Sequence, residues 1–308
     1  MPAADMQAQS LRAAAVEHLW RLGVIRSRRV ARAMTKVPRH RFLPATSPIP
    51  LERVYQTGDA LPFCVRGQEV VSTISAMDVV AIMLEALVVL PGHRVLEIGT
   101  GSGYNAALLQ ELVEPGGEVV SVELDAEVAR QAAATLAELG YRAVRVVQED
   151  GSRGYEARAP YDRIIVTAST PWIPRAWFEQ LRPAGRLVMP WSTMLWLLAL
   201  RRTRLALAGH PAGRAVFLPL QVTPEEKGAE TPPEAEAPAA GVPGFPPLPA
   251  WLKEAEKQKA GVGGETPALV HVRVQATVAP PGQAPRVLAP PPPWSGPAFR
   301  ALTWVLSR

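Results

Sequence analysis

Apolar side chains recur at helical spacing in the first part of the chain. Residues 10–40 are therefore predicted to form helices. Residues 41–72 are predicted to be a mixed loop, because prolines interrupt them repeatedly. A further amphipathic helix is predicted over residues 75–90, with Ser75 near its N-cap.

From residue 94 onward, short apolar strands alternate with helical segments. This alternation is typical of a parallel sheet with helices on both faces, so the predicted fold class is α/β with a doubly wound, Rossmann-like sheet. Strand-like runs at 195–201 and 215–220 predict an antiparallel edge. The predicted strands are 94–98, 117–122, 143–147, 161–167 and 185–189, and the predicted helices are 104–112, 125–139 and 173–181.

The composition changes at about Gln221. Residues 222–250 contain eight prolines and five glutamates, which is typical of a linker. Beyond it, residues 269–278 alternate apolar and polar side chains, as a half-exposed strand does. We therefore divide the chain into an N-terminal helical and loop segment (1–72), a core (73–220), a linker (221–250) and a small C-terminal α/β extension (251–308).

Composition limits the classes of protein that remain. The 308 residues are 48% hydrophobic and 20% charged, which is ordinary for a globular protein with a sizeable core. We see no signal-peptide pattern and no apolar run near membrane-spanning length, so we expect no membrane partner. The single Cys64 excludes an internal disulfide and fits a reducing compartment, the cytoplasm. A net charge of +5 with scattered arginines gives no coherent basic face, so we expect no nucleic-acid partner.

The first segment with chemical content is a glycine-rich turn between a predicted strand and a predicted helix. Residues 95–104 read VLEIGTGSGY, so the acid Glu97 precedes Gly99, Gly101 and Gly103. Hydride-transferring enzymes instead use G-x-G-x-x-G to hold a pyrophosphate. A carboxylate disfavours a pyrophosphate and suits a cationic ligand such as S-adenosylmethionine, which carries a sulfonium and an ammonium. A tight turn without a ligand is the alternative.

Two further acids end the next two predicted strands. Glu123 is placed to accept hydrogen bonds from both ribose hydroxyls, whereas Asp125 fits a helix N-cap better. Asp150 can accept from an adenine amino group, and Gly151 leaves room for the ring, although Asp-Gly also favours a plain turn. Parallel strands place their carboxyl ends at one edge, where such sheets bind ligands. Together the three acids predict a site for S-adenosylmethionine.

Several motifs occur in the order found in the protein-L-isoaspartate O-methyltransferase family. VPRHRFLP at 37–44 resembles the family's V-P-R-x-x-F-x-P element, and ARAPYDRIIVTA at 157–168 resembles its strand before the site. Residues 73–75 resemble the start of its T-I-S-Q-P motif, but Ala76-Met77 replace Gln-Pro. The resemblance covers roughly residues 10–220, and the last 90 or so residues have no counterpart in the small repair enzymes.

The resemblance implies a class I methyltransferase fold in which 73–220 binds S-adenosylmethionine and 1–72 lies on the substrate side. It implies that Ser75 holds the substrate carboxylate, with a plain helix N-cap as the alternative. A carboxylate is already ionised at pH 7, so methyl transfer to it needs no general base, and we predict no metal. The predicted cofactor-binding residues are Ile74, Glu97, Gly99, Thr100, Gly101, Ser102, Gly103, Glu123, Asp150, Gly151 and Thr167.

Four functions remain open from the sequence. The first is methylation of an aspartate in a modified ribosomal peptide, which promotes succinimide formation; some family members with C-terminal extensions act in this way. The second is repair of isoaspartate in damaged proteins. The third is a small-molecule or RNA methyltransferase, since fold does not fix substrate. The fourth is a protein that binds S-adenosylmethionine without turnover. The predicted partner is a peptide or protein bearing aspartate or isoaspartate, and the oligomeric state stays open.

Overall fold

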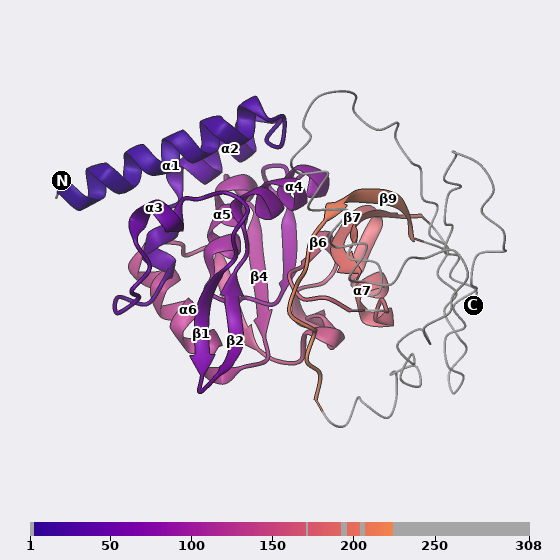
Figure 1. The fold of residues 1–308 in the computed structure, drawn as a ribbon. Helices are drawn as coiled ribbons and strands as arrows, with labels where there is room; N and C mark the ends of the chain where they lie inside the picture. Colours follow the sequence, from indigo (N-terminus) through magenta and orange to yellow (C-terminus); the bar gives the residue numbers. More distant parts are fainter. Residues whose placement is uncertain (1–2, 171, 192–195, 204–206, 224–308) are drawn as a thin grey trace, which may run out of the picture.

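Seven strands form a central sheet with helices on both faces, as Figure 1 shows. The computed structural model describes residues 3–170, 172–191, 196–203 and 207–223. The first five strands in spatial order are parallel to one another, and each of the last two pairs antiparallel with the strand before it. This arrangement confirms the predicted α/β class. In spatial order they are β5 (Val144–Gln148), β4 (Glu118–Glu123), β3 (Arg94–Ile98), β6 (Tyr161–Val166), β7 (Leu181–Trp191), β8 (Trp196–Arg202) and β9 (Leu207–Arg214).

The helices divide between the two faces because side chains alternate along each strand. Val95 and Val119 join the larger buried cluster, which includes residues of α1, α2, α4, α5 and α6. Leu96 and Ile98 join the second cluster, to which α7 contributes Trp177. The helices are α1 (Ala3–Arg21), α2 (Arg28–Lys36), η1 (Arg39–Phe42), α3 (Leu51–Val54), α4 (Met77–Leu87), α5 (Tyr104–Val113), α6 (Ala126–Glu138), η2 (Gly151–Arg153), η3 (Glu156–Arg158) and α7 (Arg175–Gln180).

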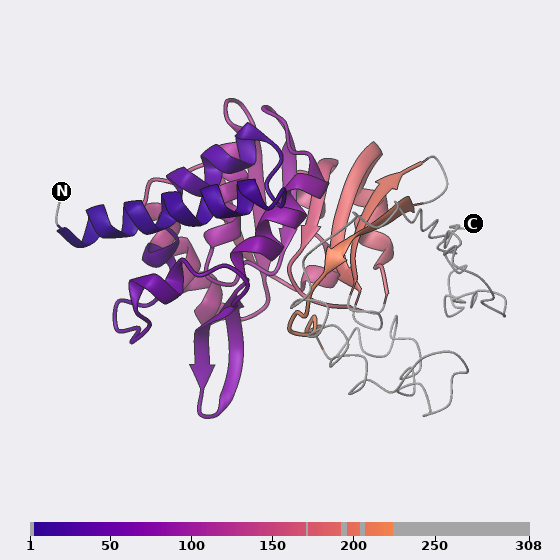
Figure 2. The ribbon, with the colours of Figure 1, turned by 45° about the horizontal axis from the view of Figure 1, so that its top comes forward.

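Residues 61–74, inside and beyond the predicted loop, form a hairpin instead. Strands β1 (Leu61–Arg66) and β2 (Glu69–Ile74) pair antiparallel, and Figure 2 shows the hairpin projecting from the body of the protein. The mixed loop predicted over 41–72 did not include these two paired strands. Pro62 was interpreted as a breaker of secondary structure. It lies on β1, an edge strand paired only with β2, and edge strands tolerate proline. Leu61 and Ile74 anchor the base of the hairpin in the core.

The antiparallel edge lies at a different place in the chain from the one predicted. β8 matches the predicted run, but its partner is β9, and residues 215–220 do not continue as a strand of this sheet. These residues instead pass the end of β6, where Ser169 N donates to Leu218 O and Leu220 N donates to Ser169 O, both at 2.8 Å. β9 was missed because its sequence, LAGHPAGR, contains glycines and a proline and lacks apolar alternation.

Ser75 lies one residue before the N-cap of α4. Ala76 occupies the N-cap position without a side-chain cap, and the helix begins at Met77. Residues 224–250 of the predicted linker, the C-terminal extension and the alternating strand at 269–278 lie outside the described residues. In the described part of the chain, no helix is long and apolar enough to cross a membrane.

Candidate active site

The glycine-rich turn follows β3 and leads directly into α5. Gly99 has a φ of 93°, a conformation that side chains with a Cβ rarely adopt. A Cβ built on Gly99 would lie 2.6 Å from Thr167 Oγ1, so the position requires glycine for two reasons. Thr167, at the end of β6, also donates to Ile98 O at 3.0 Å and to Gly99 O at 2.5 Å. The turn is therefore held from the neighbouring strand.

Glu97 lies fully buried beneath the turn. Its Oε1 accepts from Asn105 Nδ2 at 2.7 Å and its Oε2 from Ser121 Oγ at 2.5 Å. Ser121 Oγ also lies 2.6 Å from Thr100 Oγ1, inside the turn. Burial raises the pKa of the Glu97 carboxyl to about 7, although the two hydrogen bonds oppose the shift. This network joins β3, β4, the turn and the first turn of α5; direct contact of Glu97 with a cationic ligand stays a prediction.

Glu123 ends β4, beside the turn. Its Oε2 accepts from Gly101 N at 2.9 Å and its Oε1 from Asp125 N at 3.2 Å. Burial raises the pKa of the Glu123 carboxyl, and the backbone hydrogen bonds from Gly101 and Asp125 oppose this shift. Asp125 is the N-cap of α6, as predicted, and accepts from the N–H groups of Glu127 and Val128. The two acids thus have the separate positions that the sequence indicated.

Asp150 lies just after β5, the third strand that contributes to this edge of the sheet, and is the N-cap of η2. Its Oδ1 accepts from Ser152 N at 2.9 Å, and its Oδ2 accepts from Thr223 N at 2.5 Å. Burial raises the pKa of the Asp150 carboxyl, but the hydrogen bonds outweigh burial and hold it below its ordinary value. A Cβ on Gly151 would lie 2.6 Å from Ile98 Cγ2, so the backbone here packs directly on β3. Trp177 Nε1 donates to Gly151 O at 2.8 Å and fixes the segment from α7.

The remaining predicted residues surround the turn. Thr100 and Ser102 are buried; the Thr100 hydroxyl bonds to the Ser121 side chain, and Ser102 Oγ accepts from Tyr104 N at 3.3 Å. Ile74 is buried at the base of the hairpin. Ser75 is half-buried between β2 and α4, and its hydroxyl has no hydrogen-bond partner among the described residues. That hydroxyl is therefore available to a ligand.

Several supporting residues were missed by the sequence reasoning. Ser121 could have been found, because the parallel register places it directly beside Glu97. Arg39 of the V-P-R element is fully buried, donates from Nε to Val54 O at 3.0 Å and lies over the Tyr104 ring, 5.1 Å from its centroid. It thus supports the start of α5. Thr223 gave no signal, because its contact with Asp150 spans 73 residues of sequence.

These residues fit S-adenosylmethionine better than a phosphate-bearing nucleotide. The ends of β3, β4 and β5 are neighbours, so the turn, Glu123 and Asp150 follow one another along a single edge of the sheet. Two carboxylates at that edge repel a pyrophosphate and can accept from ribose hydroxyls and an adenine amino group. Gly151 follows Asp150 directly and packs against Ile98, and room for an adenine ring beside it stays a prediction. Among the described residues, no cluster of three or more His, Cys, Asp or Glu side chains could hold a metal ion.

The fold and this edge define a class I S-adenosylmethionine-dependent methyltransferase. The family model for protein-L-isoaspartate(D-aspartate) O-methyltransferases matches residues 10–220, and the chain belongs to that family. The protein-L-isoaspartate O-methyltransferase of Methanopyrus kandleri is 51% identical over 176 residues, which cover 57% of this chain and 74% of that protein.

Two solved structures extend the comparison. A protein-L-isoaspartate O-methyltransferase has a TM-score of 0.62 and 33% identity, over 68% of this chain and 66% of that one. A Plasmodium falciparum protein described as a putative protein-L-isoaspartate O-methyltransferase, solved with S-adenosyl-L-homocysteine, has a TM-score of 0.56 and 19% identity. It covers 68% of this chain and 98% of that one, and at this identity it supports the fold alone.

Proposed function

We propose that this protein methylates the carboxylate of an isoaspartyl or aspartyl residue in a peptide or protein. The observation that carries the proposal is the position of Ser75. Its unengaged hydroxyl stands between the hairpin and α4, directly after buried Ile74 and on the chain that contacts the glycine turn. A hydroxyl donor there can orient a carboxylate oxygen toward a methyl group held at the edge of the sheet.

The chemistry asks little of the protein beyond orientation and exclusion of water. When bound, S-adenosylmethionine supplies a methyl group on a sulfonium, and transfer to a carboxylate oxygen leaves the methyl ester and S-adenosylhomocysteine. The substrate carboxylate is ionised at neutral pH, so no residue has to remove a proton.

The preferred substrate in this proposal is an aspartate of a modified ribosomal peptide. Ala76 and Met77 replace the family's Gln-Pro directly after Ser75, and both side chains are buried, so the replacement changes the packing beneath the segment that carries Ser75. The ester then reacts without the enzyme. The next backbone nitrogen attacks the ester carbonyl carbon, loses its proton, and methanol leaves as the five-membered succinimide closes.

Mass spectrometry with three peptides tests both levels of the proposal. They are a linear isoaspartyl peptide, the same sequence with an ordinary aspartate, and a cyclised peptide encoded beside the gene. A gain of one CH2 on any of them supports carboxyl methylation. Gain followed by loss of methanol on the cyclised peptide alone supports peptide modification, and gain on the isoaspartyl peptide alone supports repair. Binding of S-adenosylmethionine with no methylation of any peptide would overturn the proposed activity.

The cytoplasm remains the predicted location, because the chain contains a single cysteine.

A further inference from the structure

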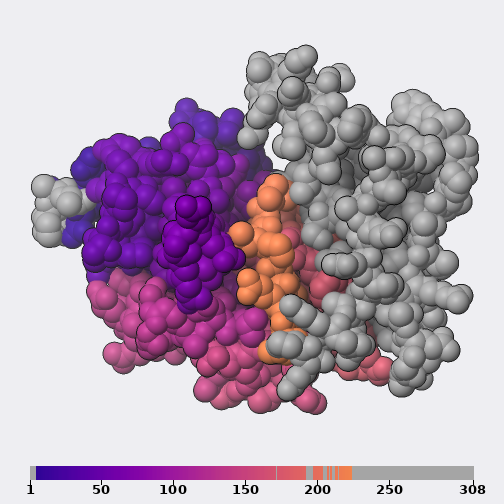
Figure 3. All heavy atoms as spheres, turned by 60° about the horizontal axis from the view of Figure 1, so that its bottom comes forward, coloured from indigo at the N-terminus to yellow at the C-terminus, as the bar shows by residue number. Residues whose placement is uncertain are grey.

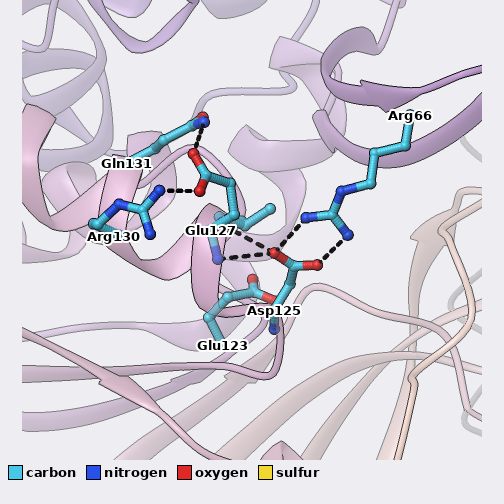
Figure 4. A network of polar contacts seen from close by, with 7 residues as sticks. Arg66, Glu123, Asp125, Glu127, Arg130 and Gln131 are labelled. Carbon is cyan, nitrogen blue, oxygen red and sulfur yellow. Dashed lines mark hydrogen bonds and ion pairs between the residues drawn. The ribbon is translucent and has the colours of Figure 1, made fainter.

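The β1–β2 hairpin contacts the cofactor edge at two separate points. Near its base, a Cβ built on Gly101 would lie 3.2 Å from Ser72 Oγ and 3.5 Å from Thr73 O. At its tip, Arg66 Nη1 and Nη2 donate to Asp125 Oδ2 and Oδ1 at 2.6 and 2.8 Å, as Figure 4 shows. Gly101 follows β3 and Asp125 follows β4, which are neighbours in the sheet. The hairpin therefore contacts the chain just after each of the two strands, and Glu123, the acid predicted to bind the ribose, is the last residue of one of them, β4.

Asp125 is a firm anchor for the arginine. Its Oδ1 also accepts from Glu127 N at 3.0 Å and Val128 N at 3.1 Å, because it caps α6. Its own N–H donates to Glu123 Oε1, and Glu123 Oε2 accepts from Gly101 N. The hydrogen bonds thus run from the hairpin tip through Asp125 and Glu123 back to the glycine turn. The carboxylate that holds the hairpin, Asp125, is thus joined by one hydrogen bond to Glu123, the carboxylate predicted to bind the ribose.

Little else holds the tip in place. Val65 and Val70, paired across the two strands, are 52% and 38% exposed. Among the described residues, the bonds to Asp125 are the only side-chain hydrogen bonds or ion pairs that join residues 65–70 to the rest of the protein. Figure 3 shows the hairpin on the same face of the protein as the orange end of the described chain.

We propose that Arg66 is a positioning residue that closes the hairpin over the ribose end of the cofactor site and slows release of the cofactor and its product. The pair is bidentate, which restricts the arginine to one geometry and so fixes the tip relative to α6. The inference rests on the S-adenosylmethionine cofactor of the family and not on the identity of the methylated peptide.

The test is the dissociation rate of S-adenosylhomocysteine from the full-length chain, measured by surface plasmon resonance. Arg66→Met keeps the aliphatic part of the side chain and removes its charge. We expect release to accelerate about three- to tenfold, which is the range that the loss of one exposed, bidentate ion pair can produce. Asp125→Asn keeps an N-cap acceptor but loses the ion pair, and should reproduce the effect. The double variant should add nothing further, because both changes break the same contact.

Arg130→Met is the matched control. It removes another exposed ion pair from the first turns of α6, that of Arg130 with Glu127, which does not involve the hairpin (Figure 4). It should leave the release rate unchanged. Arg66→Lys, which keeps the charge but not the two parallel bonds, should fall between wild type and Arg66→Met. Thermal unfolding of each variant verifies that it folds.

Equal release rates for wild type and Arg66→Met would overturn the inference, and so would an Arg130→Met effect of the same size. Either result would mean that the Arg66–Asp125 ion pair has no specific effect on the release of S-adenosylhomocysteine. No peptide substrate enters the measurement, so a wrong assignment of the substrate leaves its outcome unchanged.

Discussion

The glycine turn and the β1–β2 hairpin border the same site but are held in opposite ways. The turn is fixed from beneath by the buried Glu97–Ser121–Asn105 network and from the side by Thr167. The tip of the hairpin depends on one exposed ion pair of Arg66. Changes to the turn should therefore abolish binding, whereas changes to the hairpin should alter how fast ligands leave. The comparison separates a rigid binding surface from an adjustable cover.

Gly99→Ala should give the largest effect. The new Cβ would meet Thr167 Oγ1 at 2.6 Å while φ stays at 93°, so we expect a loss of about 2–4 kcal/mol in stability and no measurable cofactor binding. Urea unfolding and calorimetric titration measure the two. Gly23→Ala is the control, because Gly23 has a positive φ with nothing within 4 Å of its Cβ position. It should cost only about 1 kcal/mol and leave binding intact.

Ser75→Ala should come next and should separate chemistry from cofactor binding. Loss of one donor to the reacting carboxylate is expected to lower kcat about 100-fold with S-adenosylmethionine affinity unchanged. The hydroxyl has no partner among the described residues, so stability should hardly change. Steady-state kinetics with a peptide that the wild-type protein methylates provide the readout. Full activity in this variant would remove Ser75 from the proposed site.

Glu97→Gln should reveal a pH-dependent contribution to stability beneath the turn. In the folded protein Glu97 keeps its proton up to about pH 7, whereas its ordinary pKa is 4.5. Below pH 4.5 both the folded and the unfolded chain hold this proton. As pH rises toward 7 the unfolded chain releases it first, so the free energy of unfolding falls, by on the order of 2–3 kcal/mol, and then levels off.

The variant should lack this decline, so the difference between wild type and Glu97→Gln should shrink or reverse between pH 5 and pH 7.5. Urea unfolding at a series of pH values measures it. A parallel pH profile for the two proteins would show that Glu97 titrates normally despite its burial. Glu123, whose pKa is also raised by burial, remains in both proteins and cancels in the comparison.

Salt should produce the smallest effect, and only on the hairpin. Raising ionic strength weakens exposed ion pairs but leaves buried hydrogen bonds nearly untouched. We expect S-adenosylhomocysteine to leave wild type about two- to threefold faster in high salt, with no such change in Arg66→Met. The same salt series should not alter the stability difference between Gly99→Ala and wild type. A salt effect that persists in Arg66→Met would assign it to some other pair.

The parts that sequence predicted well are those fixed by local chemistry. The strand at 94–98 and the helix beginning at Tyr104 are confirmed, because buried apolar residues flank a turn that only glycines can form. Asp125 was identified as an N-cap from its place before an alanine-rich helix. The acids were recognised from the residues that follow each strand, and the predicted parallel topology indicated that they lie along one edge of the sheet.

What escaped prediction depends on partners distant in sequence. β9 is a strand because β8 offers it a free edge, not because LAGHPAGR favours one. Arg66 gains its meaning from Asp125, 59 residues away. Nothing near Ser75 in sequence indicated that Ala76 would hold the N-cap and leave the serine hydroxyl unengaged. Tertiary contacts decided each of these cases.

The hydrogen bond from Thr223 to Asp150 has a practical consequence for where the chain can be shortened. The family match ends at residue 220, which invites a cut there. Such a cut would keep the backbone hydrogen bonds between residues 218–220 and Ser169. It would remove Thr223, whose backbone N–H donates a hydrogen bond to Asp150 Oδ2. A chain trimmed at 220 would then lose cofactor affinity for a reason unrelated to the extension itself. The earliest cut that leaves this edge intact falls after residue 223.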